Sequence, residues 1–281
     1  MVSQKIPQCY ASLVERISSR QNAIVSRYRA VARGDDQDLM LLDGTHLLDE
    51  ALSAGTRLDH VAVTVEAHAR HDVAALTARA IHAGVPLVEV TAPVMDALSP
   101  VQSASPIVAL ACRPPHATDW WSDADPLVLI ASDIQDPGNV GAILRVAEAA
   151  GVTAAVCTGA CADPFSWKAV RGSMGSALRL PVAQRPLLDT EVRTARARGV
   201  RVVATVPRDG VSLFEADLTG PLAVLIGSEG VGLPPAVLAD ADLRVTIPMM
   251  APVESLNAAV AAAVLLFEVR RQRLARGPAT A

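Results

Sequence analysis

The chain has 281 residues, which is enough for two domains of ordinary size, each with its own core. Hydrophobic residues make up 51% of it, yet no apolar run approaches the ~20 residues that span a bilayer, so we expect a soluble protein without a membrane partner. A formal net charge of −4 argues against a chain that is basic throughout, as many nucleic-acid-binding proteins are.

The start of the chain and its cysteines indicate the compartment. The first 20 residues contain no apolar segment after a basic start, so we expect no secretory signal and a cytoplasmic location. The cysteines lack CxxC spacing and neighbouring histidines, so free thiols and no metal are expected. They are Cys9, Cys112, Cys157 and Cys161.

Helical and extended patterns alternate over residues 1–113, which predicts a small α/β domain. Residues 1–33 hold six basic residues and the single acid Glu15, a pattern that suits either a solvated helix face or an RNA-binding one. We expect helices at 12–33, 45–54, 67–83 and 93–98, and strands at 39–42, 60–65, 87–90 and 107–112.

A linker is predicted at residues 114–125, which are rich in proline and polar residues. The adjacent Trp120 and Trp121 suit stacking on a nucleobase, but such a pair more often packs a linker against a domain. We therefore expect packing.

The remaining residues, 126–281, predict a second α/β domain with a mostly parallel, doubly wound sheet. Gly227, Gly230 and Gly232 follow an apolar strand, which suits a ligand loop or a tight turn. Loops of this kind gather at the carboxyl edge of a parallel sheet, where ligands bind. We expect strands at 127–131, 154–157, 200–205, 222–226 and 244–248, and helices at 140–150, 165–172, 191–197 and 257–273.

Three separated motifs resemble a known family. Residues 133–145 read DIQDPGNVGAILR, residues 227–233 read GSEGVGL, and residues 247–249 read IPM ahead of ESLNAAVAAAVLLFEVRRQ at 254–272. In this order they resemble the motifs of the SpoU-type 2′-O-ribose RNA methyltransferases, the TrmH-like branch of the SPOUT class. The resemblance implies a trefoil-knotted catalytic domain at 126–281. It also implies a ribosomal-protein-L30e-like substrate domain at 1–113, where ISSRQNAIVSRYRAVARG (17–34) and LLDGTHLLDEALSAG (41–55) are similar.

The resemblance further implies an enzyme that transfers a methyl group from S-adenosylmethionine to a ribose 2′-hydroxyl, with 23S ribosomal RNA as the expected substrate and antibiotic resistance as one expected role. Arg145 stands at the family's catalytic arginine; because a guanidinium is a poor base, we expect it to hold the target phosphate and ribose. The implied catalytic residues are Arg145, Asn139, Glu229, Ser255 and Asn257.

Two further residue sets follow from the resemblance, which also covers residues 163–175 (DPFSWKAVRGSMG). Main-chain groups are expected to recognise the cofactor, which explains why glycine and proline dominate those loops. The implied cofactor-binding residues are Thr205, Val206, Pro207, Ile226, Gly227, Glu229, Gly230, Gly232, Ile247, Pro248, Met249, Ser255 and Leu256. The implied RNA-binding residues are Arg20, Asn22, His46, Lys168, Arg171 and Ser173.

Several alternatives remain at this point. In one alternative, the RNA substrate is transfer RNA. In another, the protein is a non-catalytic ribosome-assembly module with a vestigial cofactor pocket. A nucleotide-dependent dehydrogenase is disfavoured, because no GxGxxG follows a strand with an acid at the expected distance. Residues Met250–Pro252 stand where the family more often has a glycine, so the sequence does not predict the conformation of that turn. The carboxy-terminal helix is apolar on nearly every side, which together with the resemblance predicts a homodimer through the catalytic domain.

Overall fold

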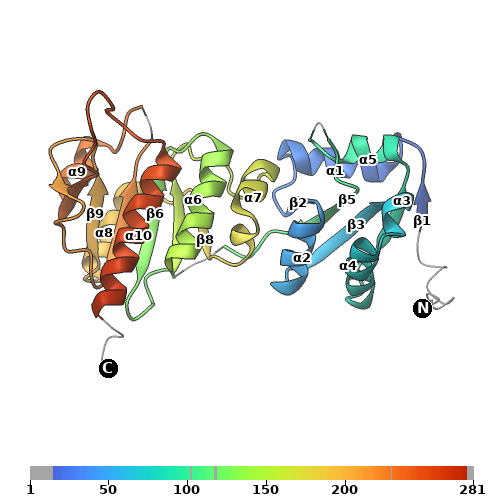
Figure 1. The fold of residues 1–281 in the computed structure, drawn as a ribbon, viewed down its shortest axis with the longest axis horizontal. Coiled ribbons are helices and arrows are strands. Elements are labelled where there is room, and N and C mark those ends of the chain that lie inside the picture. Colours follow the sequence, from blue (N-terminus) through green and yellow to red (C-terminus); the bar gives the residue numbers. More distant parts are fainter. Residues whose placement is uncertain (1–14, 102, 117–118, 229, 277–281) are drawn as a thin grey trace. The chain divides into compact units, whose positions relative to one another are not determined.

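The structure is a computed structural model that describes residues 15–101, 103–116, 119–228 and 230–276. The chain divides into two compact units, Met1–Pro114 and Pro115–Ala281. Each unit contains a sheet of its own with helices packed against it (Figure 1).

The first unit is an α/β structure with a mixed sheet of order β1-β4-β3-β5-β2. Strands β1, β4 and β3 run parallel, and β5 is antiparallel to both β3 and β2. The elements are β1 (Glu15–Ile17), α1 (Ala23–Arg33), β2 (Leu39–Asp43), α2 (Thr45–Ser53), β3 (Leu58–Thr64), α3 (Val65–His68), α4 (His71–His82), β4 (Leu87–Val90), α5 (Ala92–Leu98) and β5 (Ile107–Cys112).

The predicted helix at 12–33 is wrong in its first half. Residues Glu15–Ile17 form β1, paired with β4, and α1 begins at Ala23. The cap explains this start, because the side-chain oxygen of Asn22 accepts a hydrogen bond from the amide of Ile24 at 2.9 Å. The predicted helix at 67–83 is likewise two helices, α3 and α4, which are separated at residues 69 and 70.

The second unit contains a seven-stranded sheet of order β10-β12-β9-β11-β6-β7-β8, in which each neighbouring pair is parallel. The predicted parallel α/β fold is confirmed. The elements are β6 (Leu127–Ser132), α6 (Pro137–Ala150), β7 (Ala154–Thr158), α7 (Trp167–Ser173), β8 (Val182–Gln184), α8 (Leu188–Ala197), β9 (Arg201–Thr205), β10 (Val211–Ser212), β11 (Leu222–Ile226), α9 (Pro235–Asp240), β12 (Leu243–Thr246) and α10 (Ala258–Arg276).

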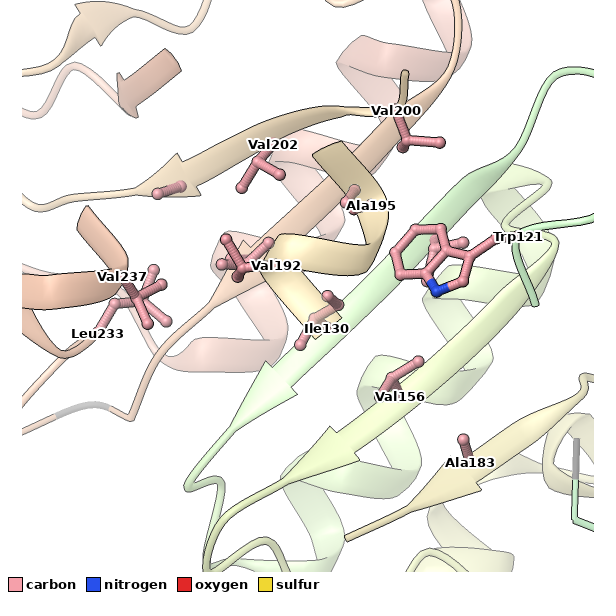
Figure 2. Close-up of a cluster of buried hydrophobic side chains, with 14 residues drawn as sticks. Trp121, Ile130, Val156, Ala183, Val192, Ala195, Val200, Val202, Leu233 and Val237 are labelled. Atoms are coloured by element: carbon pink, nitrogen blue, oxygen red, sulfur yellow. The ribbon is translucent and has the colours of Figure 1, made fainter. Parts of the chain in front are cut away.

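Helices cover both faces of this sheet. Every residue of the central strands β6 and β11 is buried, as expected for strands packed on two sides. Helices α6 and α10 pack against each other in front of β6 (Figure 1). On the opposite face, Val192 and Ala195 of α8 belong to one buried apolar cluster with Val156, Val202 and other strand residues (Figure 2).

The two linker tryptophans pack on this second face, which confirms the packing interpretation. Trp121 is buried in the same apolar cluster as α8 (Figure 2). The indole Nε1 of Trp120 donates a hydrogen bond to Oε2 of Glu191 at 3.0 Å. Burial raises the pKa of the Glu191 carboxyl above its usual range, and the bond from Trp120 opposes that shift. The tryptophans therefore fix the beginning of the unit to α8.

Candidate active site

A cavity of about 240 Å³ lies at the carboxyl edge of the second sheet. Because the strands are parallel, the segments that follow β9, β11 and β12 meet at this edge, and the start of α10 closes the cavity. Its lining residues are Thr205, Val206, Pro207, Ile226, Gly227, Ser228, Gly230, Val231, Gly232, Leu233, Leu238, Val245, Ile247, Met249, Ser255, Leu256, Ala258 and Ala261.

The loop after β11 folds back tightly on itself. An added Cβ at Gly227 would lie 2.5 Å from the carbonyl carbon of Gly232, so no side chain fits there. The amide of Gly232 donates to the carbonyl oxygen of Ser228 at 3.1 Å, and Gly232 itself has a φ of +71°, which favours glycine. Glu229, a predicted catalytic and cofactor-binding residue, lies outside the described residues. Gly227 and Gly232 thus allow the loop to close tightly, and both residues line the cavity.

Hydrogen bonds join the neighbouring strand ends into one frame. The hydroxyl of Thr205 donates to the carbonyl oxygen of Leu225 at 2.9 Å, which links β9 to β11. The amide of Val206 donates to the carbonyl oxygen of Val245 at 2.9 Å, which links the end of β9 to β12. The lining side chains are mostly aliphatic, so main-chain groups supply much of the polar character that a ligand would meet.

The start of α10 connects the cavity to the first motif. The side-chain oxygen of Asn257 accepts hydrogen bonds from the amides of Ala259 and Val260, at 3.0 and 3.3 Å, and so caps the helix. Its Nδ2 donates to Oδ1 of Asn139 at 3.0 Å. Asp136 in turn caps α6 by accepting from the amide of Asn139 at 2.8 Å. The two asparagines, 118 positions apart in sequence, therefore lie together beside the cavity.

Most of the predicted cofactor residues line this cavity. Among the described members of the set, Pro248 does not line it and is exposed. The sequence reasoning missed apolar lining residues, of which Ala258 and Ala261 carried a readable signal because their i, i+3 spacing places them on one helix face. The Met250–Pro252 turn contains a cis peptide bond between Ala251 and Pro252, and the amide of Val253 donates to the carbonyl oxygen of Met250 at 3.1 Å.

The first motif's arginine lies on α6. Arg145 is exposed, and its guanidinium makes no hydrogen bond or ion pair with any residue that the structure describes. By contrast Arg179, packed near the end of the same helix, forms a bidentate pair with Glu148 at 2.6 and 2.9 Å. Arg145 is thus available to an anion from outside the chain.

The predicted RNA-binding residues of α7 separate into two groups. Lys168 and Arg171 are exposed, and Nζ of Lys168 lies 5.5 Å from the ring centroid of Trp167. Ser173 contradicts the prediction. It is fully buried, with its hydroxyl donating to the carbonyl oxygen of Val170 at 2.8 Å.

Close packing explains the burial of Ser173. An added Cβ at Gly141 of α6 would lie 2.3 Å from the carbonyl oxygen of Ala169 and 2.9 Å from the amide nitrogen of Ser173. The two helices therefore touch through their backbones, and Ser173 lies in the contact.

In the first unit, some of the described arginines of the basic segment pair with acidic residues. Nη2 of Arg16 lies 3.0 Å from Glu89, and Nη2 of Arg27 lies 2.9 Å from Asp59. Arg20 is exposed but donates to the carbonyl oxygen of Pro93 at 2.7 Å.

The other two predicted RNA contacts of the first unit also separate. Asn22 uses its side-chain oxygen to cap α1, which is a structural role. His46 is exposed at the start of α2 and remains open to a partner.

Other classes of site are less well supported. Cys112, Cys157 and Cys161 carry free thiols. In the described part of the chain, no three His, Cys, Asp or Glu side chains come together as a metal site requires. None of the described helices has both the length and the apolar character needed to cross a bilayer.

Comparison with known families and structures matches both units. The model of the SpoU rRNA Methylase family matches residues 126–267, and that of the thiostrepton-resistance methylase N terminus matches residues 14–119. An uncharacterized tRNA/rRNA methyltransferase of Synechocystis is 36% identical over 93% of this chain and 96% of its own length. The 23S rRNA (guanosine(2553)-2′-O)-methyltransferase RlmP of Bacillus subtilis is 29% identical over 92% of this chain and 100% of its own.

A solved structure extends the likeness to the fold. The AdoMet-bound rRNA methyltransferase from Sinorhizobium meliloti superposes with a TM-score of 0.81 at 28% identity, covering 92% of this chain and 98% of its own. The family model covers the whole sheet, the cavity and the Asn139–Asn257 contact. The chain belongs to the SpoU rRNA methylase family.

Proposed function

We propose that the protein is an S-adenosylmethionine-dependent RNA 2′-O-ribose methyltransferase that acts on ribosomal RNA, with 23S rRNA as the first substrate to test. One observation carries the proposal. The cavity at the ends of β9, β11 and β12 adjoins the first motif through the bond between Asn257 and Asn139, so a cofactor site and a substrate site share one edge of the sheet.

The cavity suits the cofactor. Its volume of about 240 Å³ lies just below the ~300–1,000 Å³ typical of small-molecule sites. Aliphatic side chains such as Ile226, Ile247 and Leu256 offer surfaces for an adenine ring, and the closed glycine loop offers main-chain groups for the ribose and the amino-acid part. When bound, S-adenosylmethionine supplies a methyl group that its sulfonium makes electrophilic. No covalent intermediate with the protein is required.

The protein's own task is positioning. A ribose hydroxyl must be held in line with the methyl group, and well-oriented reactants recover ~7–11 kcal/mol of a bimolecular barrier. Arg145 has no partner among the described residues and is charged at neutral pH, so it holds the phosphate beside the target ribose. Asn139 and Asn257 fix the edge of the cavity against α6, and exposed Ser255 is placed to contact the ribose.

Calorimetry and RNA mapping test this function. The protein should bind S-adenosylmethionine, and ribose-methylation mapping of RNA from cells with and without the gene should reveal one lost site in ribosomal RNA. A lost site in transfer RNA instead would overturn the substrate assignment. A protein that binds ribosomal RNA but not the cofactor would be the non-catalytic assembly module.

Arg145→Ala separates the two halves of the site. Since Arg145 lies on α6 and does not line the cavity, the variant should lose methyl transfer while cofactor affinity stays within a few-fold. Arg145→Lys is the matched control, because it keeps the charge but loses the planar fork that binds phosphate bidentately. We expect partial activity from it. Loss of cofactor binding together with activity would contradict the assignment of Arg145 to the RNA.

The homodimer is part of the proposal and has support from α10. One face of the helix is buried, but Val260, Phe267 and Leu274 are exposed at 49%, 48% and 67%. Their spacing of seven residues aligns them in one apolar stripe, which suits packing against the same stripe of a second copy. Light scattering should give a mass of twice the 29.3 kDa of one chain. Phe267→Glu should reduce the measured mass to that of one chain. A wild-type mass near 29.3 kDa would refute the dimer.

The trefoil knot and the location complete the proposal. Strand β11 lies between β9 and β6, and the segments on either side of the cavity return to one edge, an arrangement compatible with the SPOUT knot that the motifs imply. A ribosomal substrate assigns the protein to the cytoplasm. Cell fractionation tests the location, and a protein found outside the soluble fraction and the ribosomes would contradict it.

A further inference from the structure

Left-handed backbone conformations gather at the carboxyl edge of the second sheet. The non-glycine residues with positive φ in the described chain are Asp133, Met174, Arg185 and Asp209. Three of them follow the ends of β6, β8 and β9. Residues with a Cβ disfavour this conformation, and where it persists it often marks a functional site.

For Asp133 the conformation has a structural explanation. Its carboxylate accepts hydrogen bonds from the amide of Ala160 at 2.8 Å and from the hydroxyl of Ser132 at 2.9 Å. Aspartate also tolerates left-handed backbone better than most residues, which applies to Asp209 as well. Arginine has no such tolerance. Arg185 therefore needs another explanation.

The backbone at Arg185, with a φ of +59°, is held firmly. Its amide donates to the carbonyl oxygen of Cys157 at 2.8 Å. Next to it, Nε2 of Gln184 donates to Oδ1 of Asp163 at 3.3 Å, and the same oxygen accepts from the amide of Phe165 at 2.9 Å. These bonds fix the end of β8 against the loop that leads into α7. The fixed backbone holds an exposed guanidinium at that edge.

The side chain of Arg185 differs from most arginines of this unit. Arg179, Arg193 and Arg196, for example, each lie within 3.5 Å of a carboxylate. The guanidinium of Arg185 makes no hydrogen bond or ion pair with the residues that the structure describes. In a chain with a net charge of −4, an unpaired arginine held in a disfavoured conformation suits an external anion.

We propose that Arg185 binds a backbone phosphate of the RNA, on the side of the site where α7 presents Lys168 and Arg171. The inference rests on the proposed function, because it needs an RNA strand at the carboxyl edge of the sheet. The contact positions the strand without reading its sequence, since a phosphodiester is the same at every nucleotide. Arg185 is thus an RNA-positioning residue outside the three motifs.

Arg185→Gly is the informative variant. Glycine adopts a φ of +59° freely, so the thermal unfolding temperature should stay equal to or above that of the wild type. The affinity for protein-free ribosomal RNA, measured by fluorescence anisotropy, should fall several-fold. The slope of log K against log salt should become shallower by about 1, as for one lost phosphate contact. Arg185→Lys should keep most of the affinity.

Arg193→Ala is the matched control, because Arg193 is exposed, carries the same charge, and is paired with Asp189 at 3.0 Å. We expect its RNA affinity and salt slope to match the wild type. An unchanged slope for Arg185→Gly, or an equal loss in Arg193→Ala, would overturn the inference. Failure of the wild type to bind S-adenosylmethionine or to methylate RNA would overturn the proposed function, and that result is distinct from a wild-type enzyme in which Arg185 has no effect.

Discussion

Gly227→Ala is the sharpest test of the cavity. The added Cβ would lie 2.5 Å from the carbonyl carbon of Gly232, 2.6 Å from the amide nitrogen of Leu233 and 2.8 Å from the carbonyl oxygen of Gly232. Carbon atoms in contact prefer ~3.5–4.0 Å, so the loop has to open by about 1 Å. All three atoms belong to the backbone, so no side chain can move aside.

The magnitude follows from the cost of overpacking, which is ~1–3 kcal/mol when the backbone has to shift. If the loop relaxes outward in the free protein, cofactor binding has to draw it back. The same free energy then weakens the affinity ~5- to 150-fold, since 1.4 kcal/mol is a factor of about ten. We therefore expect Gly227→Ala to fold and to bind S-adenosylmethionine at least about five-fold more weakly.

Calorimetry with S-adenosylmethionine measures the affinity, and thermal unfolding measures the stability. Gly230→Ala is the control for folding, because no atom lies within 4 Å of its added Cβ. Its unfolding temperature should equal that of the wild type. A Gly227→Ala protein with wild-type affinity would refute the reasoning that the closed loop shapes the cofactor site.

Three further predictions concern single contacts. Asn257→Ala should lower stability by ~1 kcal/mol through the lost helix cap and reduce methyl transfer. Asn257→Asp should keep the cap and lose the bond that Nδ2 donates to Asn139, so equal stability of the two variants by urea unfolding would contradict this. Burial lowers the pKa of His60 in the folded protein, so below the unfolded-state pKa of about 6.5 the unfolded state binds more protons than the folded state. Stability should therefore fall as the pH drops below that value. His60→Gln should lose this pH dependence, and an unchanged slope of stability against pH would contradict the prediction. Trp121→Ala should destabilise the second unit by ~3–5 kcal/mol. Trp120→Phe loses one hydrogen bond and should destabilise it by only ~0.5–1.5 kcal/mol. Similar unfolding temperatures of the two variants would count against the packing role of Trp121.

Much of the fold followed from local pattern. The predicted strand 222–226 coincides with β11, because an apolar run between Pro221 and Gly227 has few other solutions. Shorter elements such as β8 and β10 have three and two residues, which are too few to show a periodic pattern of apolar residues, so they could not be predicted. The start of α1 was misread because apolar residues on both sides of Asn22 continue a helical spacing, and only the cap reveals the break.

The site divides in the same way. Loop residues of the cavity could be predicted because each follows a strand, and parallel strands bring such loops together. Ser173 could not be excluded from the RNA side, since a motif specifies residue types but not which face of α7 meets α6. The pairing of Arg16 with Glu89 and of Arg27 with Asp59 could not be predicted either, because those acids lie 73 and 32 positions away along the chain.

The cavity has one wall that is synthesised last. Leu256, Ala258 and Ala261 belong to the start of α10 or precede it directly, and Asn257 ties that start to the first motif, more than a hundred residues earlier. A chain still emerging from the ribosome can complete the seven strands from β6 to β12 and yet have no closed cavity. Cofactor binding is therefore expected only after synthesis has passed the start of α10. A fragment truncated before residue 256 should not bind the cofactor, however well its sheet has folded.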